Sequence, residues 1–137
     1  MSERTLAIIK PNAVKKNCIG KIIAMAEEAG LSMVAARMKT MTSDEAEGFY
    51  AEHRERPFFP SLSKFMTSGP VLLIVFEGDG AVEKWRTLMG TTDPAKAAPG
   101  TVRKLFGDSI EANSTHGSES VAAATREVGF FFMEEFK

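Results

Sequence analysis

Six consecutive apolar residues near the middle of the chain, Val71-Leu72-Leu73-Ile74-Val75-Phe76, carry the strongest strand signal in the sequence. An unbroken apolar run of this length is typical of a strand that is buried on both faces. Gly69-Pro70 stands directly before it and ends any preceding helix. We therefore expect a central strand at 71–76, with the other elements packed around it.

Weaker patterns on either side of this run predict three more strands. Thr5-Leu6-Ala7-Ile8-Ile9 is apolar and stops at Lys10-Pro11, which places a lysine at the end of a buried strand. Apolar and polar residues alternate over 34–39, as is typical of a strand with one solvent-exposed face or edge. The last strand is expected at Phe130-Phe131-Phe132-Met133.

Helical spacing and capping residues predict helices between these strands. Helices are expected from Ile19 to a cap at Gly30, from the Thr42-x-x-Glu45 capping box to about His53, around Leu62 to Met66 after an aromatic loop at 58–60, from Ala81 to Met89 before Gly90, briefly over 101–106, and from a cap at Ser118 through Val128. This order of elements predicts an α+β fold: a ferredoxin-like sandwich in which a four-stranded antiparallel sheet carries helices over one face.

Length and composition are those of a single domain that spans residues 1–137. A chain of 137 residues with 44% hydrophobic content is long enough to bury one sizeable core. Seventeen basic and eighteen acidic residues leave a net charge of −1, which argues against a nucleic acid or an anionic membrane as the partner. The N-terminal apolar run stops too early for a signal peptide, so we expect a cytoplasmic protein.

Two common nucleotide-binding motifs are excluded. Gly20-Lys21 is followed by Ile22 instead of serine or threonine, which excludes a P-loop. Gly78-x-Gly80 lacks the third glycine of the dinucleotide fingerprint and is expected to form a hairpin-like turn. The single cysteine allows no disulfide within the chain, and its spacing from the two histidines does not fit a zinc site.

The candidate reactive residue is His116, in the stretch Asn113-Ser114-Thr115-His116-Gly117-Ser118. An imidazole is largely neutral near pH 7, so one ring nitrogen has a lone pair that can attack phosphorus. Glu127 is a candidate to accept a hydrogen bond from the other ring nitrogen and so to fix the tautomer. The alternatives are a loop histidine that is solvated or caps a helix, and an ordinary exposed carboxylate on the last helix.

Scattered cations and neutral donors add a capacity to bind phosphate. Lys10 ends a strand, Arg86 lies on a predicted helix, and Arg103 follows a long loop. Thr92 and Asn113 supply neutral donors. Each of these residues alone reads as a solvated surface side chain. Together they are the groups that phosphoryl transfer needs around the equatorial oxygens, with a nucleophile in line and Mg²⁺ bridging the phosphates.

Seven short motifs follow one another along nearly the whole chain. They are Ile8-Ile9-Lys10-Pro11-Asn12-Ala13-Val14, Phe49-Tyr50-Ala51-Glu52-His53, Pro57-Phe58-Phe59, Met66-Thr67-Ser68-Gly69-Pro70, Gly90-x-Thr92-Asp93-Pro94, Pro99-Gly100-Thr101-x-Arg103 and Asn113-x-x-His116-Gly117-Ser118. In order and spacing this pattern resembles the nucleoside diphosphate kinase family.

The resemblance implies a role for each matching residue. His116 would take the γ-phosphate from a nucleoside triphosphate, mainly ATP, hold it as phosphohistidine and pass it to a nucleoside diphosphate in a ping-pong reaction. Four residues would bind phosphates: Lys10, Arg86, Thr92 and Arg103. Asn113 would reach both the sugar hydroxyl and Lys10, and Phe58 would stack on the base. The catalytic set would be completed by Tyr50, Glu127 and Ser118. Stacking accepts any base, so broad base and sugar tolerance is expected. For Phe58 alone, core packing is the alternative.

The resemblance also implies a metal ion and an oligomer. Mg²⁺ would be held mainly by the nucleotide phosphates and water, so no protein metal ligand is expected. Members of the family form tetramers or hexamers from a shared dimer, and such assembly would cover the exposed edge of the second strand. The 91–101 loop resembles the family's loop at the trimer contact. The expected partners are therefore nucleoside triphosphates and diphosphates and further copies of the chain, and neither a membrane nor a specific nucleic acid.

The sequence departs from the family pattern at Glu119 and at Lys104-Leu105-Phe106, and two rival functions remain open. Glu119 stands where the family usually has aspartate, a change that keeps the charge, so we expect a small effect.

The main alternative to a kinase is a noncatalytic module that binds nucleotide or single-stranded nucleic acid. His116 argues against it, because a binding module needs no nucleophile. The third function is a phosphohistidine relay that acts on other proteins.

Overall fold

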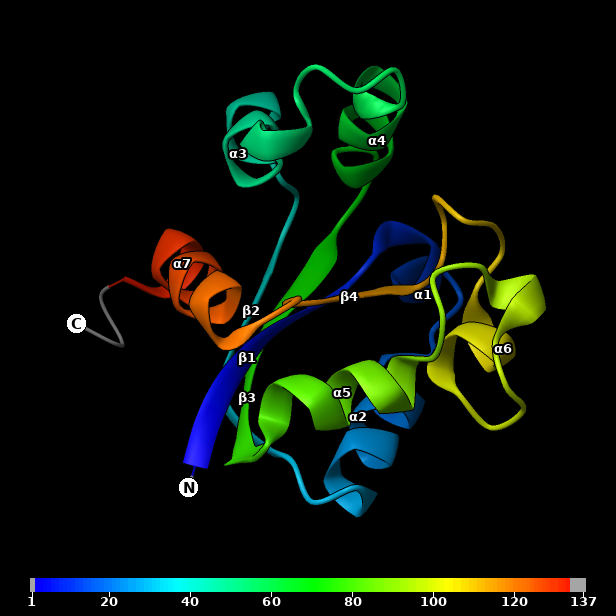
Figure 1. Cartoon of the computed structure of the whole chain (residues 1–137). Coiled ribbons are helices and arrows are strands. Elements are labelled where there is room, and N and C mark those ends of the chain that lie inside the picture. The colour runs from blue at the N-terminus through cyan, green and yellow to red at the C-terminus, as the bar shows by residue number, and fades with distance from the viewer. Residues whose placement is uncertain (1, 134–137) are drawn as a thin grey trace.

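The computed structural model describes residues 2–133 and contains a four-stranded antiparallel sheet in that part of the chain. The strands are β1 (Ser2–Ile9), β2 (Ser32–Lys39), β3 (Val71–Asp79) and β4 (Thr115–Gly117), in the spatial order β2-β3-β1-β4 (Figure 1). β3 and β1 occupy the centre and pair from Ser2 opposite Asp79 to Ile9 opposite Leu72. The predicted fold class, an α+β sandwich around a four-stranded antiparallel sheet, is confirmed.

Helices connect these strands and follow the last of them. Those of the described residues are α1 (Pro11–Lys15), α2 (Ile19–Glu28), α3 (Ser43–Phe49), α4 (Phe59–Met66), α5 (Ala81–Met89), α6 (Val102–Phe106) and α7 (Val121–Phe132), with short 3₁₀ turns η1 (Ala51–His53) and η2 (Pro94–Lys96). The capping box predicted at Thr42 is present, because its hydroxyl accepts from Glu45 N and the Glu45 carboxylate accepts from Thr42 N. In the same stretch of the structure, no helix has both the length and the apolar character to cross a membrane.

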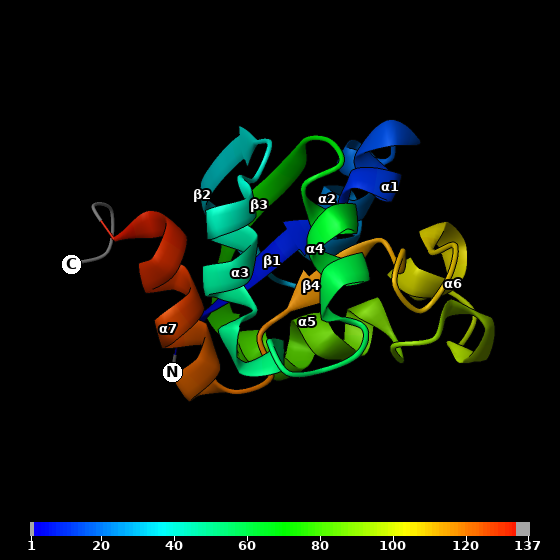
Figure 2. The same ribbon diagram turned by 90° about the horizontal axis from the view of Figure 1, so that it is seen from above.

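The helices cover both faces of the sheet, so the expectation of helices over one face needs correction. Side chains on a strand alternate between its two faces. Leu6 and Ile8 of β1 pack with residues of α3, α4 and α7, whereas Ala7 and Ile9 pack with residues of α1, α2 and α5. Figure 1 shows the first group of helices on one side of the sheet and α2 and α5 on the other, and Figure 2 looks down onto α3 and α4. The two central strands are consequently buried on both faces, as their apolar runs predict.

The strand expected at the C-terminal end is wrong. Phe130, Phe131 and Phe132 form the last turn of α7, and the fourth strand is instead the short segment that carries His116. α7 buries a stripe at helical spacing: Ala124, Glu127, Val128, Phe131 and Phe132. Aromatic residues favour strands only weakly, and burial at this spacing outweighs that preference.

Smaller corrections concern helix ends and turns. The helix expected to reach His53 stops at Phe49, and the remainder forms η1. Ser120, not Ser118, caps α7 by accepting from Ala123 N. Gly80 has φ of 61° and begins α5, so the segment around it joins a strand to a helix and is not a hairpin turn.

Candidate active site

The structure brings nine of the ten predicted site residues to a single cavity of about 810 Å³. Those nine are Lys10, Tyr50, Phe58, Arg86, Thr92, Arg103, Asn113, His116 and Glu127. They come from seven segments of the chain, including the end of β1, the region around α3 and α4, and helices α5, α6 and α7. The tenth residue, Ser118, contacts the Glu127 carboxylate and does not line the cavity.

The backbone of His116 is held in place by its neighbours in the fold. His116 lies opposite Ile8 in the β4–β1 pair, and its carbonyl oxygen accepts a hydrogen bond from the Trp85 indole at 3.1 Å. At Gly117 an added Cβ would lie 2.5 Å from the Met89 methyl carbon and 2.6 Å from a carbon of the Trp85 ring. Only glycine therefore lets β4 approach α5 this closely, and this approach places the imidazole.

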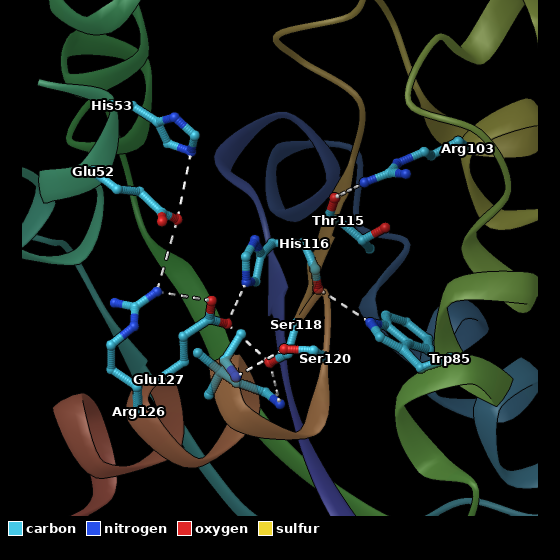
Figure 3. A network of polar contacts seen from close by, with 12 residues as sticks. Glu52, His53, Trp85, Arg103, Thr115, His116, Ser118, Ser120, Arg126 and Glu127 are labelled. Carbon is cyan, nitrogen blue, oxygen red and sulfur yellow. Dashed lines mark hydrogen bonds and ion pairs between the residues drawn. The ribbon is translucent and has the colours of Figure 1, made fainter. Parts of the chain in front are cut away.

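Glu127 and Ser118 orient the imidazole ring. His116 Nε2 lies 2.8 Å from Glu127 Oε1, and the Ser118 hydroxyl donates to the same oxygen at 2.9 Å (Figure 3). Burial raises the pKa of the Glu127 carboxyl, but the hydrogen bond and charge of His116, the Ser118 hydroxyl and the charge of Arg126 together hold that pKa below its usual value. An ionised carboxylate only accepts hydrogen bonds, so Nε2 carries the hydrogen and Nδ1 keeps its lone pair.

The side-chain amide of Asn113 joins Lys10 to the loop at Thr92. Lys10 Nζ donates to Asn113 Oδ1 at 2.9 Å, and Asn113 Nδ2 donates to the Thr92 carbonyl at 3.1 Å. The backbone N–H of Lys10 donates to the Ser114 carbonyl at 2.8 Å. Ser114 has φ of 76°, a left-handed conformation that residues other than glycine rarely adopt. This strained turn leads the chain from Asn113 to His116, so both side chains reach the same cavity.

Lys10 is a buried cation with an unusual titration. Burial lowers its pKa, the neighbouring Arg103 lowers it further, and Glu111 opposes both, with a resulting pKa of about 7. The side chain therefore changes charge near neutral pH, and an anion bound beside it would favour the charged form.

Arg103 and Tyr50 bring further donors to the cavity. Arg103 donates from Nη1 to the Gly90 carbonyl and from Nη2 to the Thr115 carbonyl, each at 2.9 Å. Burial and the nearby Arg86 charge lower the pKa of Arg103 to about 10, so it stays cationic at neutral pH. Burial and the Glu127 charge raise the pKa of Tyr50, which remains a hydroxyl donor. Arg103 Nε and Tyr50 Oη are both buried without a hydrogen-bond partner in the described structure, and such groups are ready to bind a polar ligand.

Phe58 lines the cavity and is 48% exposed, which disagrees with the alternative of core packing. Its ring centroid lies 5.7 Å from that of His53. Because the ring lines the cavity and is partly open to solvent, it offers a flat apolar surface to a ligand that enters the cavity.

Sequence reasoning missed several charged residues that line the same cavity, namely Glu52, His53, Glu111 and Arg126. Arg126 directly precedes Glu127, and His53 belongs to the motif that contains Tyr50, but each reads as a solvated side chain until the fold brings α7 beside η1. In the described part of the chain, no group of three or more His, Cys, Asp or Glu side chains is arranged to hold a metal ion.

An imidazole held by a buried carboxylate, beside one lysine and two arginines in a single cavity, is the set of groups that a phosphotransferase with a histidine nucleophile requires. The comparisons with known proteins name the family. Residues 3–136 match the family model described as nucleoside diphosphate kinase. The chain belongs to the nucleoside diphosphate kinase family.

Individual relatives agree over nearly the full length. The nucleoside diphosphate kinase of Bordetella petrii is 59% identical over 132 residues, which cover 96% of this chain and 94% of the relative. The solved nucleoside diphosphate kinase of Aquifex aeolicus superposes with a TM-score of 0.94 at 41% identity and covers 96% of each chain. That of Halobacterium salinarum, solved in complex with CDP, has a TM-score of 0.93 at 42% identity and covers 96% of this chain and 88% of its own.

Proposed function

We propose that this nucleoside diphosphate kinase moves the γ-phosphate of a nucleoside triphosphate, mainly ATP, to a nucleoside diphosphate through a phosphohistidine at His116. The kinase activity itself follows from family membership and from relatives 58–59% identical over 96% of the chain. The observation that carries the proposed route is the 2.8 Å contact between His116 Nε2 and Glu127, inside a cavity lined by Lys10, Arg86 and Arg103.

In the first half of the reaction, the Nδ1 lone pair of His116 attacks the γ-phosphorus in line with the bridging oxygen. The N–P bond forms as the P–O bond to the β-phosphate breaks, and the nucleoside diphosphate leaves with the electron pair. Glu127 accepts the hydrogen bond from Nε2 while positive charge develops on the ring, and Ser118 holds the carboxylate in place. In the second half, a terminal oxygen of another nucleoside diphosphate attacks the same phosphorus, and the imidazole leaves with the electron pair.

The remaining predicted residues bind the nucleotide in this proposal. Lys10, Arg86, Arg103 and Thr92 contact phosphate oxygens, and Tyr50 donates its hydroxyl near the transferred group. Asn113, which accepts from Lys10, reaches the sugar hydroxyl. Phe58 stacks on the base through its exposed face, a contact that every base can make. The CDP complex of the Halobacterium salinarum relative supports a nucleotide as the ligand.

We propose that Mg²⁺ enters with the nucleotide and is bound mainly by phosphates and water. The donors that converge on the cavity fit this arrangement, because ammonium, guanidinium, hydroxyl and amide groups bind phosphate oxygens. Mg²⁺ bound with the nucleotide would neutralise phosphate charge beside Lys10, Arg86 and Arg103, which line the cavity.

We also propose that the chain is a single domain and forms a cytoplasmic homo-oligomer, a tetramer or a hexamer. The exposed apolar side chains of β2 support assembly through that edge: Met33 is 44%, Val34 42% and Met38 50% exposed. An edge strand with such side chains pairs readily with another chain.

Incubation with γ-labelled ATP, followed by a GDP chase, tests the proposed route against its rivals. The protein should acquire an acid-labile label and lose it quantitatively to GDP, and His116→Ala should acquire none. A binding module would never acquire the label, and a relay would pass the label to protein in preference to GDP. Either of these results, or labelling of His116→Ala, would overturn the proposal.

A further inference from the structure

Arg126 bridges two carboxylates that belong to different parts of the fold. Its Nη2 lies 3.6 Å from Glu127 Oε2 and 3.8 Å from Glu52 Oε1. Glu127 is the next residue on α7, whereas Glu52 lies on η1, where it is also 3.8 Å from His53 Nε2. Figure 3 shows the Arg126 guanidinium between these two side chains, on the side of Glu127 that faces away from Ser118. Arg126 also lines the cavity.

The two oxygens of Glu127 have separate tasks in this arrangement. Oε1 already accepts from Ser118 and contacts Nε2 of His116. Oε2 is the oxygen that faces Arg126. Since the Glu127 residue is only 5% exposed, its negative charge is costly to bury unless cations or hydrogen-bond donors compensate it. A cation on Oε2 leaves Oε1 free to hold the imidazole.

We propose that Arg126 is a positioning residue that acts through Glu127: it holds the second carboxylate oxygen so that the first keeps His116 in the reactive orientation and tautomer. Glu52 holds the guanidinium from the opposite side and so ties it to η1. This inference rests on the proposed roles of His116 and Glu127. The charged and titratable groups around the pair are Glu52 and His53 from η1, Tyr50 from the end of α3, and His116 from β4.

Single-turnover phosphorylation of the protein by ATP tests the proposal. Arg126→Gln should slow formation of the phosphoenzyme by about fivefold, which is the effect expected of a half-exposed ion pair. Arg126→Lys should recover most of the rate because it keeps the cation. The acidic limb of the pH–rate profile should move to higher pH in Arg126→Gln, because Glu127 then protonates more easily, and it should stay in place in Arg126→Lys.

Arg4→Gln provides a matched control. Arg4 is as exposed as Arg126, at 48% against 49% of the side chain, and is also paired with a glutamate, Glu77, but neither Arg4 nor Glu77 lines the cavity that contains His116. This variant should phosphorylate at the wild-type rate. An equal loss of rate in both arginine variants would mean a general effect on the fold and would overturn the proposal.

A double-mutant cycle with Glu127→Gln decides whether Arg126 acts through the carboxylate. In the Glu127→Gln background, removal of the Arg126 charge should change the rate by less than about twofold, because the charge it acts on is absent. A full fivefold loss in that background would show an independent role and would refute the proposal, as would an unchanged rate in Arg126→Gln alone. Labelling of His116→Ala in the same assay would instead refute the proposed nucleophile, so the two failures are distinguishable.

Discussion

The two edges of the sheet are built for opposite purposes. β4 is three residues long, and α5, α6 and α7 all reach it: Trp85 and Arg103 donate to its carbonyl groups, and Glu127 holds the side chain of His116. β2 is eight residues long and is exposed or half-exposed along its whole length. The contrast teaches that an edge strand becomes a precise site when helices close over it, whereas an uncovered edge offers its backbone groups and apolar side chains to another chain.

The largest expected effect is at the covered edge. His116→Ala should reduce phosphoryl transfer by at least about 10⁴-fold, because the covalent route is lost. Nucleotide binding and folding should remain close to wild type, because the backbone contacts of β4 do not involve the imidazole. A coupled kinase assay, nucleotide titration and circular dichroism measure the three properties. Wild-type turnover in this variant would remove His116 from the mechanism.

The titration of Lys10 should have the next largest effect, on the pH dependence of stability. In the folded chain its pKa is about 7, well below the ordinary value of 10.5, so burial of the charged form destabilises the fold below pH 7. This penalty should fade as the pH rises from about 7 toward 10.5. Lys10→Met should therefore gain stability over the wild type at pH 6, by at least about 1 kcal/mol, and lose that advantage at pH 10.

Denaturant unfolding at the two pH values measures the Lys10 effect. Calorimetry in buffers of different ionisation enthalpy adds a second readout: the wild type should take up protons when it binds a nucleoside diphosphate at pH 8, and Lys10→Met should not. A stability difference that does not change with pH would contradict the lowered pKa.

Phe58 tests the more open part of the site. Phe58→Ala should raise the KM for every nucleotide by about tenfold, since base stacking on an aromatic ring contributes roughly 1–3 kcal/mol, and should change kcat much less. Steady-state kinetics with ADP, GDP, CDP and thymidine diphosphate compare the bases. A loss confined to one base would mean that Phe58 reads base identity and does not act as a general platform.

The smallest effect on chemistry is expected at the uncovered edge. Met38→Glu should weaken assembly, because it places a charge among the exposed apolar side chains of β2. The turnover per chain should stay within about twofold of the wild type, as β2 contributes no residue to the cavity lining. Light scattering gives the oligomeric state, and the same kinase assay gives turnover. An unchanged oligomeric state would contradict an interface at β2.

Sequence patterns correctly predict those elements whose apolar spacing fits only a strand or only a helix. The structure confirms the strands predicted from the apolar runs of β1 and β3, and the helices predicted from the spacing in α2 and α5. In these segments tertiary packing reinforces the local preference for a strand or a helix. The aromatic run at 130–132 fits a strand or the buried stripe of a helix, and only the continuation of α7 decides between them. β4 is too short to show a period, and its pairing with β1 depends on contacts distant in sequence.

The candidate site divides in a similar way. Motif resemblance selects His116 and Lys10, the need to fix the imidazole tautomer selects Glu127, and the structure places all three in one cavity. Ser118 is expected to cap a helix, but its hydroxyl instead reaches Glu127, a contact that depends on how α7 packs beside β4. Arg126 and Glu52 are 74 positions apart in the sequence, so no local pattern relates them.

Trp85, the one tryptophan in the chain, donates a hydrogen bond from its indole to the His116 carbonyl and can therefore serve as a fluorescent probe of the site. Trp85 is fully buried, so its emission is shielded from bulk solvent and depends on the few groups that touch it. If His116 carries the phosphoryl group as proposed, the electric field at the indole should change in each half-reaction, and a stopped-flow fluorimeter should detect both steps without any added dye.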